Sequence, residues 1–211
     1  MQTVPYRLLE SFKLGPLALR NRIVLPAMIA SYASADGSVN QRMIDYYSRY
    51  ARGGVGMVIV EGSRIDDKES ASAPNMLALH ADRYVSGLAE LAESIKSEGA
   101  VALVQMLHGG YQCKPGSING MTPIAPSAIV NPATGIKARE MDQAKILEVE
   151  ESYADCAARA QAAGFDGTEV HGAHGYLLSE FLSPRLNGRT DAYGGPIRNR
   201  AKMALEVCRK I

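Results

Sequence analysis

Apolar and polar positions along this chain repeat in a unit that joins an amphipathic helix, a glycine and a short apolar strand. The unit occurs as ARGG-VGMVIVEG, KSEG-AVALVQMLHGG and QAAG-FDGTEVHGAHG. In each copy, apolar residues recur at helical spacing before the glycine and form a nearly continuous run after it, as in a strand buried on both faces. The repeat predicts a parallel sheet with right-handed helical crossovers.

The pattern predicts four strands and four helices. The strands are expected over residues 22–28, 55–62, 100–106 and 166–172, and the helices over residues 41–52, 82–98, 142–163 and from Pro196 to the end. The last helix is predicted to bury a stripe of Ile197, Ala201, Leu205, Cys208 and Ile211. A hairpin is expected in residues 8–21, around Gly15-Pro16, and residues 108–141 form a long connection rich in Gly and Pro. Connections of that length in a compact domain are usually functional or carry local structure of their own.

Two folds compete for this pattern. A doubly wound sheet requires a glycine-rich phosphate turn after its first strand. The first strand here runs into PAMIASY, and the glycine cluster at Gly53-Gly54 precedes a strand, so it reads as a helix stop. A (β/α)8 barrel fits better, because its functional residues lie at successive strand ends.

Only four of the eight strand–helix units of a barrel are found, and the last helical pattern continues to Ile211 without a stop signal. We therefore expect residues 1–211 to form a single domain, the incomplete N-terminal part of a TIM barrel. The first four βα units would make a half barrel that follows a short N-terminal hairpin. Such a half exposes strand edges that invite pairing with another chain.

Composition narrows the choice of partners. The chain is 46% hydrophobic and 21% charged, with a formal net charge of +1, which gives no reason to expect nucleic acid or an anionic membrane as a partner. No apolar run approaches a membrane span, and MQTVPYRLLESFKLG lacks the core of a signal peptide. The three cysteines, Cys113, Cys156 and Cys208, are far apart and form no C-x-x-C pair. A reducing cytoplasm is the expected location.

Candidate chemistry gathers at the predicted strand ends. These ends are Pro26-Ala27-Met28, Glu61-Gly62, residues 105–110 with Gln105 and His108, and residues 171–176 with His171, His174 and Tyr176. In a barrel they converge on one face. They offer neutral hydrogen-bond partners with little fixed charge, and the glycines among them allow close approach to a flat ligand. The pattern contains neither a nucleophile elbow nor a carboxylate pair in one loop.

Each residue also has a purely structural interpretation. Gln105 can simply stabilise a strand end, and Tyr176 can cap the barrel rim. His171 and His174 can be metal ligands, and Glu169 alternates onto the strand face of His171. No nearby Cys or Asp completes a ligand set, so we expect no metal. The charged residues Arg189, Asp191, Arg198 and Arg200 are expected to form an ion network that holds a loop.

Taken together, these motifs resemble the old yellow enzyme family of NADH:flavin oxidoreductases. The resemblance rests on FKLGPLALRNRIVLPAM, VIVEG, LVQMLHGG and, above all, EVHGAHGYLLSEFLSPRLNGRTDAYGGPIRNR. The chain looks most similar to the branch that contains 2,4-dienoyl-CoA reductases and bile-acid enoate reductases. The resemblance covers nearly the whole chain but only the N-terminal portion of a family barrel.

The resemblance implies a role for individual residues. Pro26, Ala27 and Met28 would lie along the flavin with their backbone, and Gly62 would lie against its ring system. Gln105 would hydrogen-bond the pyrimidine edge of FMN. His171 and His174 match the family's histidine pair, which would hold the flavin edge and the substrate carbonyl oxygen. Tyr176 matches the family's proton donor.

The reaction implied is reduction of the C=C bond of an α,β-unsaturated carbonyl compound, with FMN as cofactor and NAD(P)H as electron donor. Two imidazole donors would stabilise the negative charge that builds on the carbonyl oxygen, and a tyrosine would protonate the α-carbon. The substrate would be a small enone, enoate or enoyl-CoA-like molecule. A homo-oligomer is compatible with this interpretation, and the choice between NADH and NADPH stays open.

The sequence departs from the family in two respects. Ile29 stands where relatives often have Thr, Cys or Ser. The family's flavin-contacting arginine on strand five, its phosphate-binding loops and the cysteines of any iron–sulfur cluster would all lie after Ile211. We therefore expect the 211 residues alone to bind FMN weakly or not at all. The rival hypothesis is a non-catalytic half barrel that acts through association with a partner chain.

Overall fold

The computed structural model describes residues 6–211, and its centre is a parallel sheet of four strands. Their order is β3-β4-β5-β8, the order in which they occur along the chain. The bounds are Val24–Leu25 for β3, Met57–Arg64 for β4, Val101–Leu107 for β5 and Gly167–Val170 for β8. Consecutive parallel strands with helical crossovers are the arrangement of a barrel wall, so the predicted partial barrel is confirmed. The predicted first strand, 22–28, is longer than the two residues of β3.

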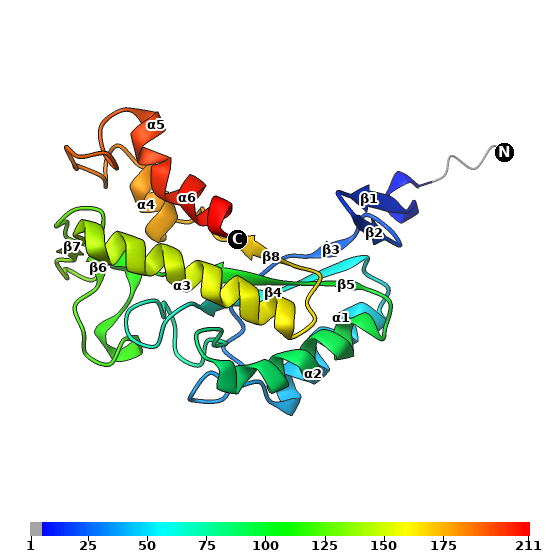
Figure 1. Ribbon diagram of the computed structural model, residues 1–211. Coiled ribbons are helices and arrows are strands. Elements are labelled where there is room, and N and C mark those ends of the chain that lie inside the picture. Colours follow the sequence, from blue (N-terminus) through cyan, green and yellow to red (C-terminus); the bar gives the residue numbers. More distant parts are fainter. Residues whose placement is uncertain (1–5) are drawn as a thin grey trace.

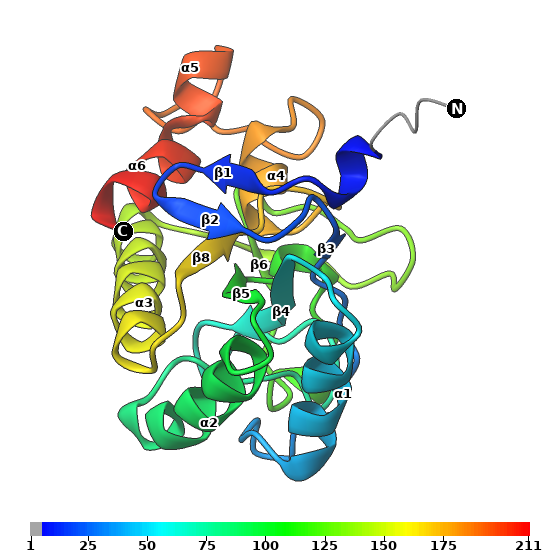
Figure 2. The same ribbon diagram turned by 90° about the vertical axis from the view of Figure 1, so that its right-hand side faces the viewer.

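Three helices cover one face of the curved sheet (Figures 1 and 2). They are α1 (Gln41–Arg52), α2 (Val85–Lys96, preceded by a 3-10 turn at Asp82–Tyr84) and α3 (Gln143–Ala162). The main core lies between them and the strands, and it includes Val58, Val60, Val104 and Met106 from the sheet. Since side chains alternate along a strand, the residues between these positions point to the other face, the inside of the curve.

The predicted hairpin is confirmed. Strands β1 (Phe12–Leu14) and β2 (Leu17–Leu19) pair antiparallel, and Gly15 takes the left-handed conformation between them, with φ 55°. Leu19 packs with Met57 and Ile59 on the inner face of the sheet. The hairpin thus lies on the side of the sheet opposite to helices α1 and α2 (Figure 2).

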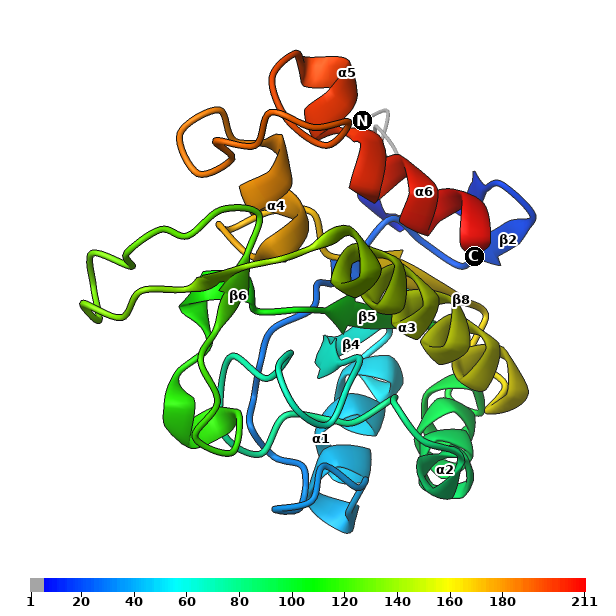
Figure 3. The ribbon, with the colours of Figure 1, turned by 60° about the vertical axis from the view of Figure 1, so that its left-hand side comes forward.

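The long connection after β5 carries structure of its own, as its length suggested. It contains two 3-10 turns, Gly110–Gln112 and Pro115–Ser117, and a parallel pair of short strands, β6 (Ile124–Ala125) and β7 (Arg139–Glu140). The sequence analysis missed β6 and β7. It also missed helix α4 (Leu177–Leu182), which lies beside β6 in Figure 3. At six residues, α4 is too short to show a helical period.

The buried stripe predicted for the last helix is wrong. The segment breaks at Ala201 into α5 (Ile197–Arg200) and α6 (Lys202–Lys210), and within α6 the predicted Leu205 and Cys208 lie on an exposed face. Met203 and Val207 are the fully buried residues, whereas Leu205 is 48% exposed and Ile197 is 60% exposed. Helix α6 packs mainly against α3.

Within residues 6–211, no helix is long and apolar enough to span a membrane.

Candidate active site

Residues from three neighbouring strand ends meet on the inner face of the sheet. Gln105 on β5 and Glu169 on β8 are paired in register, so their side chains share a face. The inward position after Glu169 is His171, whose backbone N–H donates to the Met106 carbonyl. On β4, an irregularity in pairing between Val60 and Ser63 puts Gly62 beside Gln105. The expected convergence at the carboxyl ends of the strands is therefore present.

Gly62 forms a flat spot next to the Gln105 amide. A methyl group on Gly62 would come within 3.0 Å of Gln105 Oε1 and 2.8 Å of Leu107 Cδ1. The Gln105 Nε2 donates to Glu169 Oε1 at 2.5 Å. The glycine is thus required by its close packing against Gln105 and Leu107.

The two histidines are joined by a hydrogen bond that defines their protonation. The backbone N–H of Ala173 donates to His171 Nδ1 at 3.2 Å, so the proton of this neutral ring is on Nε2. His171 Nε2 lies 3.1 Å from His174 Nδ1, which must then be the acceptor. His174 therefore keeps its own proton on Nε2. Burial, and after it the neighbouring His174, lowers the pKa of His171, which keeps the ring neutral at pH 7.

Tyr176 stands at the start of α4, beside the histidines. Its ring packs edge-on against His171, with centroids 5.0 Å apart. It is half-buried and lies against an apolar cluster of Ala71, Met76, Leu107, Cys113 and Ile118. Ile29, which follows the first strand, contacts the same cluster. The cluster thus connects the segment after the first strand, at Ile29, with the segment after the fourth strand, at Tyr176.

The turn after β5 holds the segment of His174 and Tyr176 in place. Leu177 N–H donates to the His108 carbonyl, and Gln112 Nε2 donates to the His174 carbonyl at 2.7 Å. His174 has a φ of 57°, an unusual left-handed value for a residue with a side chain. These contacts hold the turn in that conformation and fix the direction of both rings.

Two buried carboxyl groups support the loops around the site. Glu180 on α4 accepts a hydrogen bond from Tyr111 N–H at 3.0 Å, and burial raises its pKa well above the usual range. Glu61 accepts from the backbone N–H groups of Ala30 and Leu77, and burial raises its pKa too. Glu61 thereby ties the Pro26–Met28 turn to β4. Met28 itself is 49% exposed.

The site brings together Gly62, Gln105, His171, His174 and Tyr176, while Pro26, Ala27 and Met28 lie at the neighbouring strand end. The sequence analysis placed Glu169 on the face of His171 but gave it no partner, and it assigned no role to Glu61, Gln112 or Glu180. Alternation along β8 was the signal for the Gln105–Glu169 pair. No sequence signal identified Glu180, because its partner is a backbone group 69 positions away.

The loop network expected from the arginines after α4 is present in part. Arg189 is almost buried and forms an ion pair with Asp191 at 2.6 Å, and it also donates to the Pro126 and Met141 carbonyls. Arg200 donates to the Leu182 carbonyl. Residues 6–211 hold no group of three or more His, Cys, Asp or Glu side chains that could bind a metal ion.

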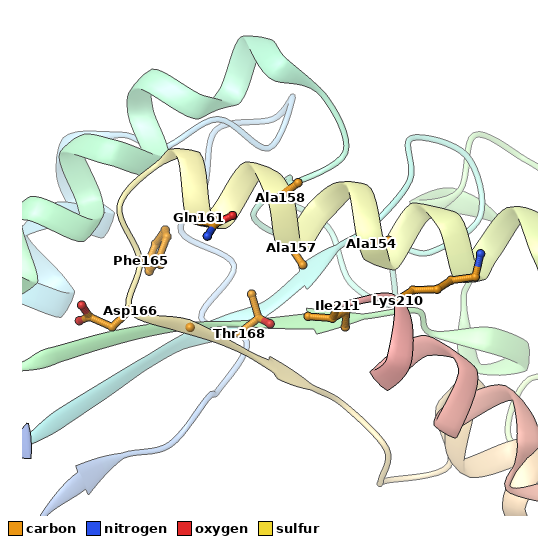
Figure 4. A pocket seen from close by; sticks show the side chains of 10 residues that line it. Ala154, Ala157, Ala158, Gln161, Phe165, Asp166, Thr168, Lys210 and Ile211 are labelled. Carbon is orange, nitrogen blue, oxygen red and sulfur yellow. The ribbon is translucent and has the colours of Figure 1, made fainter. Parts of the chain in front are cut away.

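A separate groove of about 500 Å³ lies at the other end of β8 (Figure 4). It is lined by small residues of α3 such as Ala157, by Asp166 and Thr168, and by Lys210 and Ile211 of the last helix. None of the candidate site residues lines it.

The fold and the site define a class of protein: a barrel-type α/β protein with neutral hydrogen-bond donors and acceptors at its strand ends. The chain belongs to the NADH:flavin oxidoreductase / NADH oxidase family, whose sequence pattern matches residues 7–211. The predicted family is therefore confirmed. Its members belong to the class of FMN-dependent oxidoreductases.

Individual relatives agree with this assignment. An NADH oxidase of Thermoanaerobacter brockii is 44% identical over 94% of this chain and 31% of its own length. An NADH:fumarate oxidoreductase of Klebsiella pneumoniae is 38% identical over 95% of this chain and 22% of its own length. The crystal structure of an old yellow enzyme from Pichia superposes with a TM-score of 0.90 at 31% identity, over 97% of this chain and 55% of the other. The chain thus spans about a third or less of these two curated relatives and about half of the solved one.

The described residues fit the ring of a flavin. Gly62 brings the backbone of β4 close to the Gln105 amide without a side chain between them. His171 and His174 offer uncharged ring nitrogens at the next strand end. A site with a flat floor and neutral polar groups at its rim suits a planar heteroaromatic ring with imide and carbonyl groups.

Proposed function

We propose that residues 1–211 act as one domain that supplies the first four strand–helix units of an FMN-dependent oxidoreductase barrel. The reaction would be the reduction of the C=C bond of an α,β-unsaturated carbonyl compound by NAD(P)H. The observation that carries this proposal is the His171–His174–Tyr176 arrangement at the end of β8, beside the Gly62–Gln105 floor.

The histidine pair is suited to a carbonyl oxygen. His171 Nε2–H now donates to His174, and a substrate oxygen placed between the rings would take over that hydrogen bond. His174 has an N–H of its own to offer. Neutral imidazoles can stabilise developing negative charge without the strong ground-state binding of a cation, and one such donor is commonly worth about 2.7–4 kcal/mol.

Tyr176 is suited to deliver the proton. It is half-buried and packs against His171, so its ring has a fixed direction close to the carbonyl site. Bound FMN would supply a hydride to the β-carbon, and the phenol would then protonate the α-carbon as a general acid. The hydride and the proton together saturate the C=C bond.

Pro26, Ala27, Met28, Gly62, Gln105 and His171 are the residues that we propose to contact the flavin. Glu61 supports the first of these contacts, since it holds the chain just after Met28 through the Ala30 N–H at 2.7 Å.

The substrate class is supported by a relative. Fumarate, in the name of the Klebsiella pneumoniae relative, is a C=C bond conjugated to carboxyl groups. We propose a small enone, enoate or enoyl-CoA-like substrate, and cytoplasmic location as the natural setting for a reaction that consumes NAD(P)H.

The proposal is tested with the purified chain at saturating FMN under anaerobic conditions, with NADH or NADPH and 2-cyclohexenone. Tyr176→Phe should leave flavin reduction by the nucleotide unchanged and slow enone reduction by about 10²–10⁴-fold, the usual contribution of a general acid. His174→Ala should slow enone reduction by about 10²–10³-fold. A folded chain whose enone reduction is indifferent to both substitutions would contradict the proposed roles.

A second candidate is association with a partner chain. Within the described sheet, β8 has a neighbour on one side only, and all four of its residues are partly exposed. The groove between α3 and the end of α6 runs beside this strand (Figure 4). Sedimentation at several concentrations, together with a flavin absorption scan, separates a stable flavin-free oligomer from a flavin-binding species.

A further inference from the structure

The pairing of Gln105 with Glu169 has a consequence for what the site can recognise. A carboxylate only accepts hydrogen bonds, so the group of Gln105 that faces Glu169 must be its NH2. The 2.5 Å contact between Gln105 Nε2 and Glu169 Oε1 obeys this rule. The two residues are directly opposite each other in the register of β5 and β8, so the contact is built into the sheet.

The amide oxygen of Gln105 is thereby directed away from Glu169, toward β4. It lies beside Gly62, where an added methyl group would be only 3.0 Å away. Among the described residues, the only hydrogen bond of the Gln105 side chain is the one to Glu169. The oxygen is therefore an oriented acceptor beside the Gly62 backbone, with no described hydrogen-bond donor of its own.

We propose that Glu169 is a positioning residue that locks the Gln105 amide in one orientation, so that the site selects a ring with an N–H donor at this edge. This inference rests on the proposed function, and for a flavin the donor is the imide N3–H. A freely rotating glutamine could offer either its oxygen or its NH2. The carboxylate on β8 removes that choice.

The first test needs no ligand. In ¹H–¹⁵N spectra of the full chain, the Gln105 side-chain amide is assigned by its absence from Gln105→Met. One of its two protons should be displaced downfield by the carboxylate, and the displacement should disappear in Glu169→Leu. An amide with the shifts of a free glutamine in the unmodified chain would overturn the proposal.

The second test measures selectivity. FMN and FMN methylated at N3 are titrated into the chain, and bound flavin is followed by fluorescence. The unmodified chain should bind the methylated form at least about tenfold more weakly, because the methyl group leaves the oriented acceptor unpaired. Glu169→Gln should keep the preference, since its own oxygen can accept from Gln105. Glu169→Leu should reduce it to about threefold or less, with circular dichroism to establish that it folds.

The outcomes separate the two proposals. If the unmodified chain and Glu169→Leu prefer FMN over the methylated form to the same degree, the methyl group is excluded by size alone. That result refutes the role of Glu169. A chain that binds neither flavin is the result expected if residues 1–211 alone cannot hold FMN, and the effect of Tyr176→Phe on enone reduction then remains the test of the proposed function. In that case the amide spectra still decide whether Glu169 orients Gln105.

Discussion

His171 donates a hydrogen bond from Nε2 to Nδ1 of His174 across 3.1 Å, in an order fixed by the Ala173 N–H on the other nitrogen of His171. The relationship is that of a donor chain: backbone to His171, His171 to His174, and His174 outward. It requires both rings to be neutral, because a protonated His171 would lose the Ala173 contact. The protonation state of His171 therefore determines which histidine donates the hydrogen bond between them.

Burial and the neighbouring His174 lower the pKa of His171, so we predict that His171 titrates below 6.5, the usual value for histidine. The unfolded chain binds the proton first as pH falls, so this residue's contribution is present above about pH 6.5 and is lost as pH drops through the folded pKa. Histidine ¹⁵N shifts followed by NMR check the titration. Since His80 and His108 have lowered pKa values as well, the stability slope is assigned by difference from His171→Gln. A His171 pKa at or above 6.5 would contradict the prediction.

Glu180 should behave as a neutral hydrogen-bond acceptor. Burial raises the pKa of its carboxyl well above the usual range, and its only described partner is the Tyr111 N–H. Glu180→Gln should therefore change the free energy of unfolding at pH 7 by less than about 1 kcal/mol. Glu180→Ala should cost about 1–3 kcal/mol or more, because the Tyr111 N–H is left unpaired. Urea unfolding measures both. If Glu180→Gln were as damaging as Glu180→Ala, the acceptor role would be refuted.

The repeated helix–glycine–strand pattern was sufficient to predict the parallel sheet and the place of its strands along the chain, although β3 is shorter than the predicted 22–28. It also placed the chemistry of β8, since Glu169 and His171 alternate onto one face. The supports of the site were not predictable. Gln112 and Glu180 act on backbone groups brought near by the long connection. Helix α6 has apolar residues on two faces, and only the fold shows that Met203 and Val207 are buried while Leu205 is exposed. The local sequence pattern thus predicts helices and strands. Contacts between a side chain and a backbone group far away in the sequence can be seen only in the folded structure.

Gly110 is predicted to be required by both its conformation and its surroundings. Its φ is 58°, and a methyl group there would overlap Glu180 Oε1. Gly120 is a matched control, with φ 77° and nothing within 4 Å of a methyl group. Gly120→Ala should cost about 1–2 kcal/mol for the left-handed backbone alone. Gly110→Ala should reduce the free energy of unfolding by clearly more, because the added methyl group would also displace Glu180 and with it α4. Thermal unfolding of the two variants side by side makes the comparison, and equal losses would mean that the Gly110–Glu180 contact carries no weight.

The interface of α3 and α6 should make stability depend on pH. Glu150 is 1% exposed, and burial together with a hydrogen bond to Glu206 raises its pKa to about 7. Lys202 and Lys210 oppose that shift, and the Tyr193 hydroxyl donates to Glu206. The folded chain thus holds a proton between about pH 4.5 and 7 that the unfolded chain releases.

The sign follows from that proton. Stability from Glu150 is fully present below its unfolded pKa and is lost as pH rises through the folded value of about 7. Chemical unfolding at pH 5, 6, 7 and 8 should show this decline, and Glu150→Gln should reduce it, since an amide keeps a neutral partner for Glu206 at every pH. Glu148→Gln is the control, because Glu148 is exposed on the same helix and, within residues 6–211, its side chain forms an ion pair with Lys145 alone. A decline that Glu150→Gln leaves unchanged would place its origin elsewhere in the chain.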